Sequence, residues 1–102
     1  MNYRHGDVGL FAAELPAGAI LERTEGIVLA EGEVTGHAHR IKSGPVSLWN
    51  AGKQRYIIVG EGGAMLDHEE HGPLPIAPGT YECRIQRVFD YTKEEGWRRV
   101  AD

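Results

Sequence analysis

Two pairs of histidines are the residues in this sequence that could do chemistry. His37 and His39 are separated by one residue in EVTGHAHRIKSG, and His68 and His71 enclose two glutamates in HEEH. Neutral imidazole is a common ligand for zinc, iron, nickel and copper. If the two pairs meet in the folded chain, they form a site for a divalent transition metal, and the sequence does not distinguish Zn, Fe, Ni and Mn.

The number of imidazoles that bind decides what such a metal can do. Three ligands leave a position open for water or a substrate, whereas four close the site and make it structural. In an open site the metal can activate water or polarise a small-molecule substrate, with Glu69 or Glu70 as the base. Glu69 and Glu70 are therefore the candidate catalytic residues, and Glu33 is a further candidate ligand or orienting carboxylate. Neither the reaction nor whether the chain is an enzyme follows from the sequence.

Each pair also has a simpler interpretation. A His-x-His on a strand can be two half-exposed polar residues, and HEEH can be a solvated acidic loop. His5, in YRHGDV, is expected on the surface, with a role as a further ligand as the alternative. Cys83 falls on the apolar face of a predicted strand, so we expect a small buried side chain and not a nucleophile.

The elements that must position these residues are short strands. Alternate residues of a strand point the same way, so His37 and His39 share one face, while His68 and His71 lie where a strand runs into an irregular connection. Fourteen glycines, spread along the chain, separate short β-prone runs. The expected strands are 7–15, 20–23, 27–30, 33–42, 46–49, 55–59, 64–68, 80–89 and 97–100. We predict one all-β domain, residues 1–102, built as a barrel or sandwich of about ten short strands.

The histidine pair on a strand, the later histidines and the segment PLPIAPGTYE together resemble a small cupin. The resemblance implies a double-stranded β-helix barrel with a metal held by histidines from two motifs. The first motif of cupins has a Glu after the pair and the second ends in a His, but Lys42-Ser43 and Tyr81-Glu82 stand at those places here. The chain is also similar to short uncharacterised bacterial proteins with GHxH and HxEH segments.

Composition limits the other functions. A net charge of −4 makes nucleic acid an unlikely partner, and RNA or nucleotide binding remains a weaker third option. The arginines that would serve it are Arg84, Arg87, Arg98 and Arg99. The main alternative to a metal enzyme is a non-enzymatic interaction or oligomerisation module, with a homo-oligomer or another protein as partner.

The sequence also predicts where the chain resides. It has no apolar run long enough to cross a bilayer and no signal pattern, so we expect no membrane association. A single cysteine cannot form an internal disulfide, which indicates a reducing, cytoplasmic setting.

Overall fold

The computed structural model describes residues 2–31, 38–68 and 71–85, and every regular element within them is a strand. The prediction of an all-β fold with about ten short strands is confirmed. The strands are β1 (Asn2–His5), β2 (Val8–Ala12), β3 (Ile20–Arg23), β4 (Val28–Glu31), β5 (Ala38–Ser43), β6 (Val46–Ala51), β7 (Gln54–Val59), β8 (Ala64–Asp67), β9 (Leu74–Ile76) and β10 (Gly79–Ile85). In these described parts of the chain, no helix is long and apolar enough to cross a membrane.

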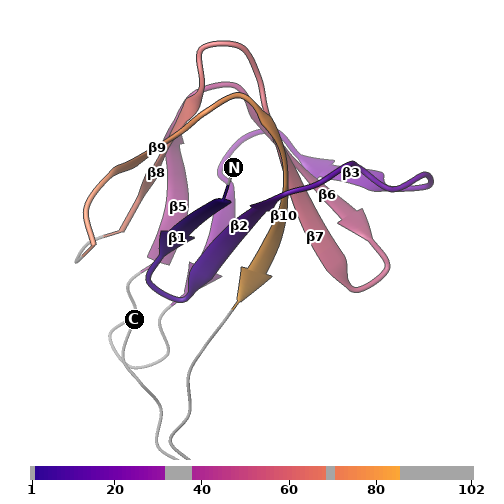
Figure 1. The fold of residues 1–102 in the computed structure, drawn as a ribbon, viewed down its shortest axis with the longest axis horizontal. Coiled ribbons are helices and arrows are strands. Elements are labelled where there is room, and N and C mark those ends of the chain that lie inside the picture. Colours follow the sequence, from indigo (N-terminus) through magenta and orange to yellow (C-terminus); the bar gives the residue numbers. More distant parts are fainter. Residues whose placement is uncertain (1, 32–37, 69–70, 86–102) are drawn as a thin grey trace, which may run out of the picture.

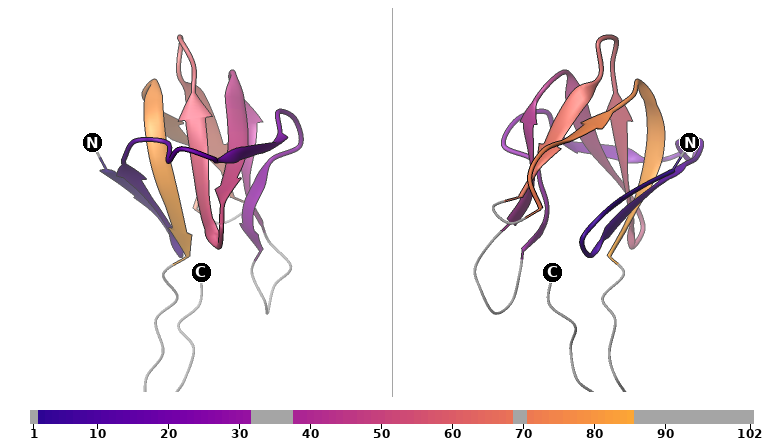
Figure 2. Two further views of the ribbon diagram at one scale, coloured as in Figure 1. Left: turned by 90° about the vertical axis from the view of Figure 1, so that its right-hand side faces the viewer. Right: turned by 60° about the vertical axis from the view of Figure 1, so that its left-hand side comes forward.

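The strands form two antiparallel sheets that face each other (Figures 1 and 2). The six-stranded sheet has the order β1-β2-β10-β7-β6-β3, and the four-stranded sheet has the order β4-β5-β8-β9. The two sheets do not share a continuous ladder, so the arrangement is a sandwich and not a closed barrel. Strand β1 lies at an edge of the six-stranded sheet, and strand β9 lies at an edge of the four-stranded sheet.

The core fills the space between the sheets. Each strand that reaches it turns alternate apolar side chains inward, as Val8 and Leu10 of β2 and Leu48 of β6 do. The other members of this core are Ile27, Leu29, Val46, Ile57, Val59, Leu66, Ile76, Tyr81 and Cys83. Because both sheets contribute, removing their apolar area from water holds the two layers together.

Polar side chains connect the sheets where backbone pairing stops. Arg55 of β7 donates from one guanidinium nitrogen to the carbonyl of Leu29 (2.9 Å) and from the other to that of Val28 (3.1 Å), both on β4. On the opposite side, the hydroxyl of Tyr3 accepts the backbone N–H of Ala77 at 3.0 Å, and the hydroxyl of Tyr81 donates to the Ala77 carbonyl at 2.7 Å. These bonds fasten the edges of one sheet to the other.

Two hairpin turns have the same backbone requirement. Gly6 joins β1 to β2 with φ of 59°, and Gly52 joins β6 to β7 with φ of 64°. Each is the first residue of a two-residue loop between paired strands, where a positive φ is needed and glycine supplies it. The two turns differ in the residues that surround the glycine.

Two strands were not predicted from the sequence. β1 has little apolar alternation, and it is ordered by its ladder with β2, in which His5 pairs with Val8. β9 falls in a connection that we expected to be irregular. Its Pro75 cannot donate a hydrogen bond, which suits an edge strand that pairs only with β8. The predicted strand 97–100 lies outside the described residues.

The double bond from Arg55 to β4 gives a test of how the sheets are held. Arg55→Met keeps much of the apolar stem but removes both donors, and hydrogen bonds from a charged group contribute about 1.5–3 kcal/mol. We expect the free energy of unfolding to fall by about 2–4 kcal/mol in urea titrations. Arg23 is the control, because it is exposed and its guanidinium donates to the carbonyl of Gly26, just after its own strand, and not to the other sheet. The Arg23→Met substitution should lower the free energy of unfolding by less than about 1 kcal/mol. Equal losses in the two variants would show that the hydrogen bonds of Arg55 do not specifically hold the sheets together.

Candidate metal site

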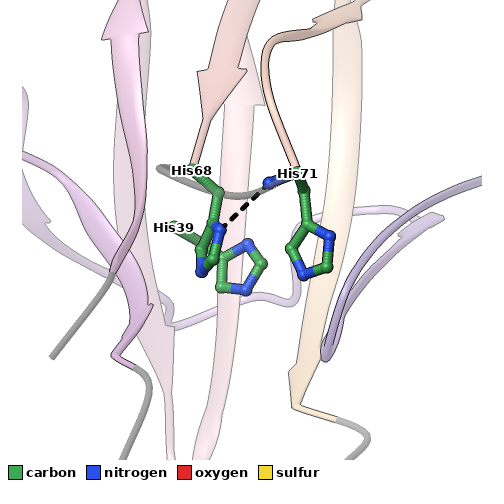
Figure 3. Close-up of side chains that lie close together, drawn as sticks. All are labelled: His39, His68 and His71. Carbon is green, nitrogen blue, oxygen red and sulfur yellow. Dashed lines mark hydrogen bonds between the residues drawn. The ribbon is translucent and has the colours of Figure 1, made fainter. Parts of the chain in front are cut away.

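Three of the predicted histidines converge between the sheets. His39 lies on β5, His68 directly follows β8, and His71 lies in the connection to β9 (Figure 3). Each offers one ring nitrogen, and these three atoms all lie within 4.8 Å of one another. The ring centroids of His39 and His68 are 4.2 Å apart, and those of His68 and His71 are 4.5 Å apart. Such a group is large and close enough to hold a metal ion.

Strand register explains why His39 meets His68. Arg40 of β5 pairs with Asp67 of β8 in an antiparallel ladder. One step further along both strands, His39 therefore stands opposite His68. Cross-strand neighbours in this relation have Cβ atoms about 4.5–5.5 Å apart, so their rings touch.

A tight turn then brings His71 back beside His68. The N–H of Gly72 donates to the carbonyl of His68 at 3.0 Å, which closes the turn. Within it, the backbone N–H of His71 donates to Nδ1 of His68 at 3.3 Å. This second hydrogen bond is longer than the usual 2.7–3.2 Å and therefore weak. A metal ion that competes for Nδ1 of His68 would have to break only this weak bond. His39 and His68 are buried, whereas His71 is exposed, so the group is open on the His71 side.

Our expectation that His5 lies on the surface is wrong. His5 is 6% exposed, its Nδ1 lies 2.9 Å from Nδ1 of His39, and its Nε2 donates to the carbonyl of Gly72 at 2.7 Å. The pairing of β1 with β2 carries His5 to the inner end of its hairpin, which faces the other sheet. The sequence did contain a signal, because Gly6-Asp7 before an apolar run is a two-residue hairpin turn.

The other residues of this hairpin turn were also missed. Gly6 lies directly against the histidines: a Cβ built on it would fall 2.6 Å from Nε2 of His71 and 2.8 Å from Cε1 of His39. No side chain fits there unless a histidine moves. Asp7 is 5% exposed, and among the described residues it is the acidic group that acts on His39, where it favours the protonated ring. His5, Gly6 and Asp7 therefore belong to the surroundings of the three histidines.

Four of the predicted site residues cannot be placed. His37, Glu33, Glu69 and Glu70 lie outside the described residues. The roles given to them, as a fourth ligand for His37, as a further ligand or orienting group for Glu33, and as a base for Glu69 or Glu70, stay predictions.

Burial keeps His39 neutral. The pKa of His39 is lowered from 6.5 to about 4, chiefly by loss of hydration and then by the neighbouring rings of His68, His5 and His71 in that order of effect, while Asp7 opposes them. A neutral imidazole has a lone pair to give, which is the form that binds metals. Nε2 of His39 is buried and accepts no hydrogen bond from the described residues. A buried polar atom without a hydrogen-bond partner raises the free energy of the folded state. A cation bound to that atom would remove this cost.

The three ligand atoms are wider apart than in an occupied site. Nitrogens bound tetrahedrally to zinc at about 2.0–2.1 Å lie about 3.4 Å from one another. Contraction from the observed separations needs small rotations of the rings, and the exposed His71 has room for them. With three imidazoles bound, one coordination position remains for water or an anion.

Cys83 and Arg84, which are described, do not belong to the group of potential ligands. Cys83 is 8% exposed, so the expectation of a small buried side chain is confirmed, and burial raises the pKa of its thiol to about 11, which disfavours the reactive thiolate. Arg84 is exposed, but it donates to Glu82 at 2.8 Å and lies over the ring of Phe11. The remaining arginines of the RNA- or nucleotide-binding option, Arg87, Arg98 and Arg99, lie outside the described residues.

The fold and the site define the chain as an all-β protein with a histidine cluster between two sheets. More particularly, it belongs to a family described as a domain of unknown function, DUF8820, whose model matches residues 4–86. The matched region includes His5, His39, His68 and His71. No curated protein and no solved structure is similar enough to the chain to match it. The family therefore agrees with the extent of the fold and leaves the activity to be argued from the site.

The lowered pKa of His39 predicts how stability depends on pH without metal. Between pH 6.5 and about 4 the unfolded chain protonates this ring and the folded chain does not. The contribution of His39 to the free energy of unfolding is therefore at its full value above pH 6.5 and declines as the pH falls towards 4. Urea unfolding with chelator present, followed by tryptophan fluorescence at pH 7.5, 6, 5 and 4.5, should show this decline. In His39→Leu the decline over this interval should be smaller, and an identical profile would contradict the assignment.

Proposed function

We propose that this protein binds one divalent transition metal through His39, His68 and His71 and keeps a coordination position open. The observation that carries the proposal is the buried Nε2 atom of His39. Its Nε2 is out of contact with water and accepts no hydrogen bond from the described residues, and its ring is grouped with two further imidazoles. A core that places neutral rings in this way gains little from packing alone, because the polar nitrogen is desolvated without compensation. A bound cation compensates it.

The donor set favours some metals over others. All three proposed ligands are imidazoles, which suit zinc, iron, nickel and copper, whereas manganese prefers carboxylate and water oxygens. Zinc with three histidines and a water is a common catalytic arrangement. We therefore take zinc, iron and nickel as the candidates, with zinc tested first.

An open position implies chemistry at the metal. A zinc-bound water can lose its proton near pH 7, and a bound carbonyl or phosphoryl group is polarised. The exposed edge at His71 is where a small substrate would enter. Glu69 and Glu70 stand between His68 and His71 in the sequence, and we retain them as the proposed base. The substrate would be a small molecule with an oxygen that can bind the metal.

The cupin-like prediction fits this proposal in part. A metal held between two β-sheets by histidines is the arrangement that the resemblance implies. The ligands proposed here, however, come from β5 and from the connection after β8, ahead of the Pro78-Gly79 turn, and not from the strand after it. We therefore propose a site of cupin-like location with its own ligand set.

Metal titration tests the proposal. Protein stripped with chelator should take up one equivalent of zinc, measured by calorimetry and by elemental analysis. Even partners outside the ligand set cost about 10- to 100-fold in affinity when removed, so His39→Gln, His68→Gln or His71→Gln should each weaken binding by more than about 100-fold. Absence of stoichiometric metal, or three variants with unchanged affinity, would refute the site.

Two further readouts separate an open functional site from the alternative of a non-enzymatic module with a structural metal. Circular dichroism of the metal-free protein should keep its β-sheet signal if the metal is functional, and should lose it if the metal is structural. His37→Gln tests for a fourth ligand. Unchanged affinity in this variant supports an open site with three ligands, and a loss comparable to that of His39→Gln supports a closed one.

The Gly6 turn provides a steric test with a close control. Gly6→Ala and Gly52→Ala both place a side chain at a φ near +60°, a cost of about 1–2 kcal/mol in each case. Only the first pushes a Cβ against His71 and His39, because nothing lies within 4 Å of the Cβ at Gly52. Gly6→Ala should weaken zinc binding at least tenfold, while Gly52→Ala should bind as the native chain does. Equal affinities would place the metal away from this turn.

A further inference from the structure

His5 has both ring nitrogens engaged, and neither is left to bind a metal. Its Nε2 lies 2.7 Å from the carbonyl oxygen of Gly72, and its Nδ1 lies 2.9 Å from Nδ1 of His39. The ring is almost wholly buried, so water does not compete for either bond. The three residues form a chain of hydrogen bonds from β5, through β1, to the connection between β8 and β9.

The direction of each bond follows from the chemistry of its ends. A carbonyl oxygen can only accept, so Nε2 of His5 carries a hydrogen. In the neutral form of His5 the ring has one N–H, so its Nδ1 has a lone pair and accepts from Nδ1–H of His39. His39 is fully buried, and its ring can bind a metal only in the neutral form, which likewise has one N–H. With its one hydrogen on Nδ1, its lone pair is on Nε2, the atom that accepts no hydrogen bond within the described residues.

We propose that His5 is a positioning residue that fixes His39 in its Nδ1–H form and so presents the Nε2 lone pair to the metal. A histidine with its hydrogen on Nε2 has no lone pair there and cannot bind a cation through that atom. His5 thus decides which nitrogen of His39 is available before any metal arrives. The consequence for the metal rests on the proposed function, whereas the form of the His39 ring is a property of the metal-free protein.

The same chain of bonds supports a bound metal. Histidine ligands in metal sites usually donate their second N–H to a carboxylate, carbonyl or water, which orients the ring and raises its basicity. Here the acceptor is a second imidazole, whose own N–H is held by a backbone carbonyl. A cation on Nε2 of His39 makes its Nδ1–H more acidic, which strengthens the bond to His5 and then the bond from His5 to Gly72. His5 therefore contributes to affinity without touching the metal.

Nitrogen-15 NMR tests the proposal without metal. Long-range proton–nitrogen spectra of labelled protein, with chelator at pH 8, distinguish a ring nitrogen that carries hydrogen from one that does not. We expect hydrogen on Nδ1 of His39 and on Nε2 of His5. Hydrogen on Nε2 of His39 would overturn the proposal.

Two substitutions of His5 connect the ring form to binding. His5→Phe keeps a ring but offers no acceptor, so the hydrogen of His39 should redistribute to Nε2 and zinc affinity should fall about 10- to 100-fold. His5→Gln offers a carbonyl oxygen, so it should keep the Nδ1–H form and most of the affinity. A purely structural role would make both variants weaken binding in proportion to their loss of stability. A Phe variant with unchanged ring form and unchanged affinity would overturn the proposal.

The failure of this inference can be distinguished from failure of the metal site. If the spectra show the expected ring forms and zinc does not bind, His5 still fixes the form of His39, and the metal-binding function is the part that is refuted. If zinc binds through His39 while its Nδ1 carries no hydrogen, the metal site stands and the role of His5 is overturned.

Discussion

The loss of water from the His39 ring is the constraint on which the rest of the site depends. An imidazole in water is half protonated near pH 6.5 and repels cations in that form. Enclosed between two sheets, His39 stays neutral to about pH 4 and cannot satisfy its inner nitrogen with solvent. Its only described polar partner is His5, on the other nitrogen. The fold thus buries a polar ring whose desolvation is costly, and the proposed cation would offset that cost.

The sandwich form makes such a site possible. A closed barrel of this size fills its interior with side chains. Here the sheets are separate ladders, and edges β1 and β9 are bridged by side chains: Tyr3 and Tyr81 hold Ala77, and His5 holds Gly72. The seam between the sheets can therefore carry polar groups that the apolar centre of the core would exclude. The histidines occupy this seam.

The sequence predicted the class of fold and part of the site for a clear physical reason. Alternating apolar residues and frequent glycines are local signals, so strands such as 20–23 and 55–59 were found within a residue of their ends. Strand pairing is not local. That His39 meets His68 depends on the register of β5 with β8, and these strands are separated by a hairpin that belongs to the other sheet.

His5 illustrates the limit more sharply. Nothing in YRHG alternates, and a histidine near a terminus usually lies in solvent. Its burial follows from two long-range facts, the ladder of β1 with β2 and the approach of β1 to Gly72, which is 67 residues away in the chain. The sequence Gly6-Asp7 predicts a hairpin turn. It does not predict which sheet edge that hairpin faces.

The position of β1 also determines when the cluster can exist during folding. β1 precedes the other described strands in the chain, yet among them it pairs only with β2, which in turn pairs with β10 on its other side. Contacts of such sequence separation form late and slowly, because much chain entropy is lost before they contribute stability. The histidines therefore come together only when the domain is nearly folded. Before that, the chain has no assembled site for an ion. Cation capture would report that folding has finished and, by binding only the native state, would help to keep it folded.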